Sequence, residues 1–177
     1  MAEPLRLFLT GPPRCGKTTL LIRLAEAARG RAQGFYTEEV REAGRRVGFR
    51  IVTLPGNESA WLSRKGGKGD KGGPRVGSYL VDLAAIERLM VPPMRCPGEG
   101  GLILIDEIGK MECLSAPFRQ AILALLDSPC HVVATIALRG GEFTEGLKRR
   151  PGVRLVEVNP GNRDGLAAQL AEELRGL

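Results

Sequence analysis

The chain has 177 residues, the usual size of one domain, and we expect a single domain over residues 1–177. Its composition is 43% hydrophobic and 26% charged, and no apolar run reaches the roughly 18 residues of a membrane span, so no membrane contact is expected. The net charge of +6 suits an anionic ligand and would also suit nucleic acid. Aromatic residues make up only 5%, so nucleic-acid binding stays open but without support from a stacking surface.

The N-terminal stretch MAEPLRLFLTG has an early acid and a short apolar run, which is not the pattern of a signal peptide. A cytoplasmic protein, and a monomer, are therefore expected. The four cysteines form no C-x-x-C pair, and the lone histidine, His131, cannot complete a common zinc site. We expect reduced thiols and no structural metal. The cysteines are Cys15, Cys96, Cys113 and Cys130.

Apolar segments and helical patterns alternate along the chain. The predicted strands are 5–10, 34–40 with 47–54, 101–106, 131–136 and 153–158. The predicted helices are 17–29, 79–90, 116–127, 140–149 and 164–175. LILID and HVVATI are continuously apolar, as strands buried on both faces should be. The alternation predicts an α/β fold, a three-layer sandwich with a mainly parallel sheet covered on both faces.

Two segments break this alternation. Residues 41–46, REAGRR, lie between two runs of mixed polarity and predict an inserted β-hairpin with Gly44 at its tip. Residues 63–77 contain six glycines and show neither helix nor strand period, so they are predicted to form a long loop. Both a solvated basic loop and a lid that contacts phosphate fit this composition, and the two alternatives stay open.

Residues 11–18, GPPRCGKT, match the phosphate-binding motif G-x-x-x-x-G-K-[ST] between a predicted strand and a predicted helix. Two glycines let backbone N–H groups approach phosphate oxygens, the lysine supplies a positive charge, and the threonine hydroxyl suits Mg²⁺. Arg14 is either solvated or able to reach the transferred phosphoryl group. The residues expected at the nucleotide are Gly11, Pro12, Pro13, Arg14, Cys15, Gly16, Lys17, Thr18 and Thr19.

A pair of acids, Asp106 and Glu107, ends the apolar run 101–106. A carboxylate at the carboxyl end of a strand beside the phosphate loop suits a Mg²⁺ ligand, so Asp106 and Thr18 are the predicted metal residues. Glu107 can then polarise a water for attack on the γ-phosphate, unless the two acids only cap the next segment. Asp106-x-x-Gly109 also has the GTPase form D-x-x-G, but no N-K-x-D for guanine follows.

Thr135 lies near the carboxyl end of the predicted strand 131–136 and is a candidate γ-phosphate sensor, or else a buried threonine bonded to the backbone. An acid directly after the magnesium aspartate fits the division of phosphate-loop enzymes that activate water with a strand-borne glutamate. In that division an additional strand ends in such a polar sensor.

Several motifs in order, GPPRCGKTTL, GFYTEEVREAGRRVGFRIV, VGSYLVD, LILIDEIGKME and NPGNRD, resemble the nucleoside-triphosphatases first described in thermophiles, whose vertebrate members are called cancer-related nucleoside-triphosphatase. The resemblance implies a RecA-like P-loop fold and slow, Mg²⁺-dependent hydrolysis of several nucleoside triphosphates. It also implies that Glu112 is a further acid near the site, and that Asn162 and Arg163 contact the base. Arginine can stack on any base, so broad specificity is expected. The predicted catalytic residues are Lys17, Glu107, Glu112 and Thr135.

The phosphate loop alone does not decide what the bound triphosphate is used for. We expect hydrolysis to nucleoside diphosphate and phosphate, with Lys17 and Mg²⁺ offsetting charge and Glu107 orienting water. A kinase for a nucleotide, a small molecule or nucleic acid would use the same loop but needs an acceptor pocket. A regulatory ATPase linked to nucleic acid is the third alternative, and polynucleotides should stimulate it in a salt-dependent manner.

Overall fold

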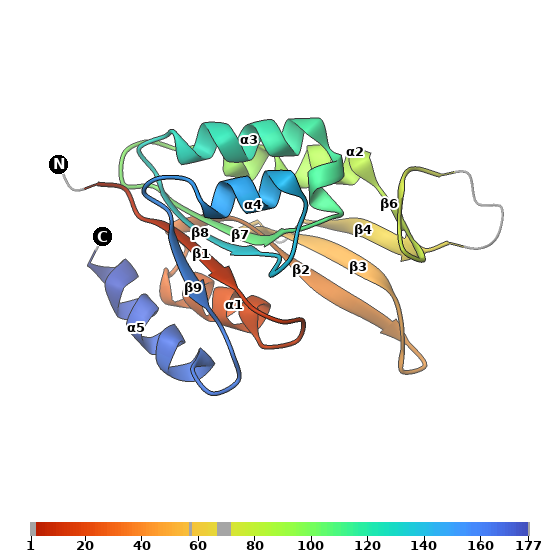
Figure 1. The fold of residues 1–177 in the computed structure, drawn as a ribbon, viewed down its shortest axis with the longest axis horizontal. Helices are drawn as coiled ribbons and strands as arrows, with labels where there is room; N and C mark the ends of the chain where they lie inside the picture. The colour runs from red at the N-terminus through yellow and green to blue at the C-terminus, as the bar shows by residue number, and fades with distance from the viewer. Residues whose placement is uncertain (1–2, 57, 67–71, 177) are drawn as a thin grey trace.

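The computed structural model describes residues 3–56, 58–66 and 72–176, which form one sheet with helices on both faces (Figure 1). The described strands are β1 (Arg6–Thr10), β2 (Ala32–Glu42), β3 (Arg45–Leu54), β4 (Ser59–Lys65), β5 (Arg75–Val76), β6 (Tyr79–Val81), β7 (Leu102–Ile108), β8 (His131–Ile136) and β9 (Arg154–Glu157). The helical elements are α1 (Lys17–Ala27), α2 (Leu83–Ala85) running into the π-helix η1 (Ile86–Met90), η2 (Pro92–Met94), η3 (Glu112–Leu114), α3 (Ala116–Leu126), α4 (Glu142–Lys148) and α5 (Arg163–Arg175). None of these helices has the length and apolar character that crossing a membrane requires.

The sheet has a parallel half and an antiparallel half, in the order β5-β6-β4-β3-β2-β7-β8-β1-β9. Strands β2, β7, β8, β1 and β9 pair in parallel, which places their carboxyl ends at one edge. The predicted hairpin is confirmed: β2 and β3 are antiparallel, with Glu42 opposite Arg45. Ala43 and Gly44 between them both have positive φ, 46° and 75°, as a type I′ turn requires.

Strand β1 shows how the sequence makes three layers. Leu7 and Leu9 belong to the apolar cluster that contains Leu24 of α1, whereas Phe8 belongs to the cluster that contains Phe118 of α3. Successive strand residues point to opposite faces, so a continuously apolar strand supplies both cores. In Figure 1, α1 and α5 cover one face, and α2, α3 and α4 cover the other. The predicted three-layer α/β fold is confirmed.

Two predicted boundaries are wrong around the antiparallel half. The predicted loop 63–77 overlaps two strands: β4 continues to Lys65, and β5 pairs with β6. The predicted helix 79–90 begins only at Leu83, because Tyr79 and its neighbours pair with β4 and the Asp82 side chain caps the helix by accepting a hydrogen bond from the Ala85 N–H at 2.9 Å. Residues 67–71 of the predicted loop lie outside the described residues.

The expectation of reduced thiols is wrong for two cysteines. Cys96 and Cys130 form a disulfide with 5.8 Å between their Cα atoms, inside the range that a disulfide requires. It joins the segment after η2 to the residue that precedes β8. Cys15 and Cys113 are free thiols. The pairing follows from the parallel sheet, which brings together positions 34 residues apart that no local spacing rule connects.

Candidate active site

The predicted phosphate loop connects β1 to α1 and depends on two glycines. Gly11 and Gly16 have φ values of +151° and +103°. A Cβ on Gly11 would lie 2.3 Å from the Val158 carbonyl oxygen, and one on Gly16 would lie 2.3 Å from Cδ of Arg163. At Gly11 the obstacle is backbone, so a side chain would require the loop to rearrange; at Gly16 the Arg163 side chain could move aside, and the positive φ is what favours glycine.

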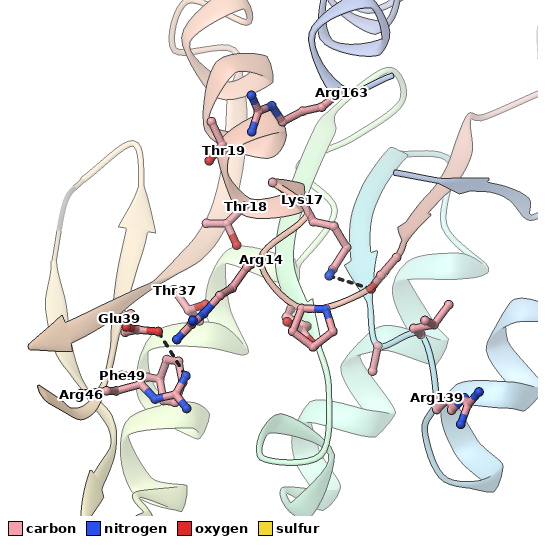
Figure 2. Close-up of a pocket in the computed structure, with 16 residues that line it drawn as sticks. Arg14, Lys17, Thr18, Thr19, Thr37, Glu39, Arg46, Phe49, Arg139 and Arg163 are labelled. Atoms are coloured by element: carbon pink, nitrogen blue, oxygen red, sulfur yellow. Dashed lines mark hydrogen bonds and ion pairs between the residues drawn. The ribbon is translucent and has the colours of Figure 1, made fainter. Parts of the chain in front are cut away.

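Lys17, the first residue of α1, lies inside this loop with 8% of its surface exposed. Its Nζ donates a hydrogen bond to the carbonyl oxygen of Gly11 at 3.0 Å (Figure 2) and another to that of Pro12 at 3.2 Å. The ammonium is therefore held by the loop itself at the edge of the cavity. Cys15 is buried in the core between the sheet and α1 and does not line the described cavity, so its predicted nucleotide contact can involve only the backbone.

Asp106, at the carboxyl end of β7, is fully buried and accepts four hydrogen bonds. Its Oδ2 accepts from the hydroxyls of Thr18 at 2.9 Å and Thr37 at 3.1 Å, and from the Thr37 N–H at 3.3 Å. Its Oδ1 accepts from the Thr135 hydroxyl at 2.5 Å. The structure thus brings together three predicted residues, and adds Thr37 of β2. Thr135 is fully buried behind Asp106, and its predicted contact with the γ-phosphate stays a prediction.

The pair Thr18 and Asp106 fits Mg²⁺. Their side-chain oxygens lie 2.9 Å apart beside the phosphate loop, and Mg²⁺ is usually held by one or two protein oxygens together with substrate phosphates and water. The described residues contain no group of three or more His, Cys, Asp or Glu side chains suited to a metal. The Thr18 and Asp106 oxygens are of the kind that holds Mg²⁺ together with the phosphates of a nucleotide.

Two further acids follow Asp106. Glu107 lines the cavity, and its pKa is raised by burial and by the Asp106 carboxylate, against the opposing effect of Lys17. The peptide bond between Asp106 and Glu107 is cis. Glu112 is buried, and its Oε2 accepts a hydrogen bond from the Gly109 N–H at 3.1 Å. Burial, with a smaller effect of the Glu107 charge, raises the pKa of Glu112 from 4.5 to about 8.

A cavity of about 720 Å³ extends from the phosphate loop to the β2–β3 hairpin. On the hairpin side, Glu39 pairs with Arg46 at 3.1 Å, and the Arg46 guanidinium lies over the Phe49 ring, 5.2 Å from its centroid. Figure 2 shows Arg14, which is solvent-exposed with a positive φ of 64°, extending from the loop toward this wall. The lining residues are Gly11, Pro13, Arg14, Gly16, Lys17, Thr18, Thr19, Thr37, Glu39, Arg46, Phe49, Glu107, Ala137, Leu138, Arg139 and Arg163.

The two residues predicted to contact the base have different surroundings in the structure. Arg163 begins α5 and lines the cavity near Thr19 (Figure 2). The Asn162 amide is instead engaged within its own loop, accepting from the Asn159 N–H at 2.8 Å and donating to the Glu157 carbonyl at 2.9 Å. Six predicted site residues do not line the described cavity: Pro12, Cys15, Asp106, Glu112, Thr135 and Asn162.

The hairpin wall was not predicted as part of the site. Thr37, Glu39, Arg46 and Phe49 reach the cavity because β2 pairs with both β7 and β3. A sequence signal existed: Thr37 and Glu39 are polar residues at alternate positions of β2, so they face the same side of the sheet beyond its apolar first half. The carboxyl end of β2 is therefore part of the binding edge.

A Gly-rich loop at a helix N-terminus, a buried aspartate beside its threonine and a parallel sheet define the class of P-loop nucleoside-triphosphate-binding proteins. The chain belongs to the nucleoside-triphosphatase family: the family model described as "NTPase" matches residues 6–171. Nucleoside-triphosphatase THEP1 of Thermotoga petrophila is 42% identical over 173 residues, which cover 97% of this chain and 93% of the relative. The human cancer-related nucleoside-triphosphatase is 41% identical over 174 residues, 90% of this chain and 91% of the relative.

Two solved structures share the fold. The crystal structure of THEP1 from Aquifex aeolicus superposes with a TM-score of 0.85 at 36% identity, covering 96% of this chain and 99% of that one. The solution structure of the human cancer-related nucleoside triphosphatase gives a TM-score of 0.80 at 38% identity, covering 99% and 98%. The predicted family resemblance is confirmed.

Proposed function

We propose that the protein is a Mg²⁺-dependent nucleoside-triphosphatase that converts ATP, GTP and other nucleoside triphosphates to the diphosphate and phosphate. The observation that carries the proposal is the acid pair at the end of β7: Asp106 is fixed by four hydrogen bonds, and the next residue, Glu107, lines the cavity. The printed names of the relatives describe the same activity.

The chemistry follows from what each group can do at its position. Mg²⁺ bound by Thr18, Asp106 and the phosphates would supply positive charge to the transferred phosphoryl group. The Lys17 ammonium exchanges its two carbonyl partners for phosphate oxygens and stabilises the charge that develops on them. Glu107 orients a water and takes its proton while the water oxygen bonds to the γ-phosphorus.

Broad base specificity rests on Arg163, whose planar guanidinium lines the cavity and can stack on any base. Slow turnover is proposed from the motif resemblance alone. A cytoplasmic location and a monomeric state stay predictions from the sequence.

The decisive variant is Glu107→Gln, which keeps the shape of the side chain and removes the carboxylate. Phosphate release at saturating nucleotide should fall by roughly 10² or more, whereas the dissociation constant from calorimetry should change little. Glu142→Gln, at an exposed acid in the first turn of α4, is the matched control and should leave both unchanged. If nucleotide binding is lost together with turnover, Glu107 is a metal ligand or a structural residue. If both persist, water is activated elsewhere.

A further inference from the structure

A second cavity, of about 270 Å³, lies next to the nucleotide cavity. The two share five lining residues, Thr37, Phe49, Glu107, Ala137 and Arg139. Figure 2 shows Thr37 and Phe49 on one wall below the phosphate loop and Arg139 on the opposite wall. Because Glu107 borders both spaces, a molecule in the second cavity can reach the same carboxylate that faces the nucleotide.

One part of the wall of this second cavity is apolar. Phe49, Leu62 and Val76 come from β3, β4 and β5, and Met111 comes from the loop after β7. Leu62 is almost fully buried, and all four side chains belong to or pack against the larger apolar cluster. This part of the wall therefore suits a hydrocarbon body.

The end of the cavity next to the nucleotide is polar and charged. Thr37, Glu107 and Arg139 line both cavities there, and Lys110 and the buried carboxyl of Glu112 also line the second one. A neutral ligand with one hydroxyl group would match this polarity, with the hydroxyl at Glu107 and the apolar body against Met111. After transfer of a phosphoryl group the product would be an anion, which Lys110 and Arg139 attract.

We propose that this second cavity binds a phosphoryl acceptor, a small neutral alcohol with an apolar body, and that the protein transfers the γ-phosphoryl group of the nucleotide to it. The inference rests on the proposed function, because it needs the triphosphate in the first cavity. The acceptor oxygen forms a bond to the γ-phosphorus, and the bond from that phosphorus to the β–γ bridging oxygen breaks. The nucleoside diphosphate leaves, and the hydroxyl proton passes to Glu107.

The size of the cavity supports one small acceptor. Benzene fits a cavity of about 150 Å³, so a space of about 270 Å³ that opens to the nucleotide cavity has room for one ring and a short hydroxylated arm. An occupant would also displace the water that otherwise meets the γ-phosphate, because Glu107 borders both spaces. Hydrolysis is then the reaction of the protein without its acceptor.

The test uses the full chain with three probes, 2-phenylethanol, cyclohexylmethanol and 1-hexanol. With ¹³C-labelled methionine methyl groups, at least one probe should shift the Met111 signal saturably, in the presence of Mg²⁺ and a non-hydrolysable ATP analogue. The buried Met90 and Met94, which do not line this cavity, are internal references. With ATP, mass spectrometry should detect the phosphate monoester of the bound alcohol, formed at least tenfold faster than without enzyme.

Val76→Phe fills the cavity from β5 and should abolish both the methyl shift and the monoester, whereas Leu155→Phe, on the 44% exposed side chain of Leu155 in β9, should leave both intact. If no probe moves Met111 in the wild-type protein, the cavity is not an acceptor site. If a probe binds but only inorganic phosphate appears, transfer is overturned and the hydrolase stands. If the wild-type protein releases no phosphate from ATP in the absence of any probe, the proposed function is overturned instead.

Discussion

The hydroxyl of Thr135 lies 2.5 Å from Oδ1 of Asp106, and both side chains are fully buried. This bond joins the carboxyl ends of two adjacent parallel strands, β7 and β8, directly beneath the nucleotide cavity. It leaves Oδ2 to face Thr18 and Thr37. Thr135 therefore fixes which oxygen of Asp106 is presented to the phosphate loop.

Replacement of Thr135 by Val removes this bond at nearly constant volume. We expect the Mg²⁺ concentration for half-maximal phosphate release to rise by roughly 10- to 100-fold, the usual effect of losing a partner that orients a metal ligand. Thr135→Ser keeps the hydroxyl and should stay near the wild-type value. A Mg²⁺ titration at saturating ATP makes the comparison, and an unchanged midpoint in Thr135→Val would contradict the role of this bond.

Glu112 should make the protein less stable as the pH rises. Its pKa is about 8 in the folded chain against an ordinary 4.5, so the folded state favours the protonated carboxyl. The stabilisation is fully present below pH 4.5 and is lost as the pH rises through about 8. Urea unfolding across this range should show a falling free energy of unfolding, and Glu112→Gln should flatten the fall. Glu142→Gln should keep the wild-type dependence of the free energy of unfolding on pH. If Glu112→Gln keeps it too, Glu112 is not the group that causes it.

The Cys96–Cys130 disulfide closes a segment of 34 residues and should stabilise the fold. Reduction, or replacement of both cysteines by serine, should lower the free energy of unfolding by about 2–4 kcal/mol. The free thiol Cys113 supplies the control, since Cys113→Ser removes no bond. Urea unfolding with and without a phosphine reductant measures the effect. The reductant should destabilise the wild-type protein and leave the double variant unchanged, and any other pattern means that the bridge is not formed in solution.

Arg163 should govern nucleotide affinity without selecting the base. Wild-type hydrolysis of ATP, GTP, CTP and UTP should agree within about tenfold, because stacking tolerates every base. Arg163→Ala should raise KM for all four by a similar factor, about tenfold. Arg154→Ala removes an exposed arginine that pairs with Glu173 and controls for net charge. Steady-state kinetics with the four nucleotides would reveal one strongly preferred base, which would refute stacking as the basis of recognition.

Three strands of the parallel half were predictable because they are almost continuously apolar. β1, β7 and β8 are buried on both faces, and their runs of apolar residues predict that burial. The antiparallel half was harder to predict, because β4 mixes Trp61 with charged and small residues. This segment is a strand because it pairs with β3 and β6. The disulfide was missed for the same reason: its partners meet only once the sheet has formed.

The candidate site likewise has a part that the sequence predicted and a part that it did not. The phosphate loop and the acid pair are local motifs, and the structure places Lys17, Thr18, Asp106 and Glu107 together as their spacing predicted. Thr37 and Phe49 are contributed by the hairpin, and their approach depends on strand order rather than on any motif. Asn162 is adjacent in sequence to a lining residue, yet its amide closes its own loop. Adjacent positions of a motif need not face the same space.

The hydrogen bonds from Lys17 to the carbonyl oxygens of Gly11 and Pro12 have a consequence for how the protein assembles. A buried ammonium without partners would oppose folding until a ligand arrived to neutralise it. Here two carbonyl oxygens of the loop accept hydrogen bonds from the ammonium, so the chain can reach its native state before it binds a nucleotide. Synthesis and maturation of the protein then do not depend on the nucleotide supply of the cell, and nucleotide-free protein should survive purification with its binding loop already formed.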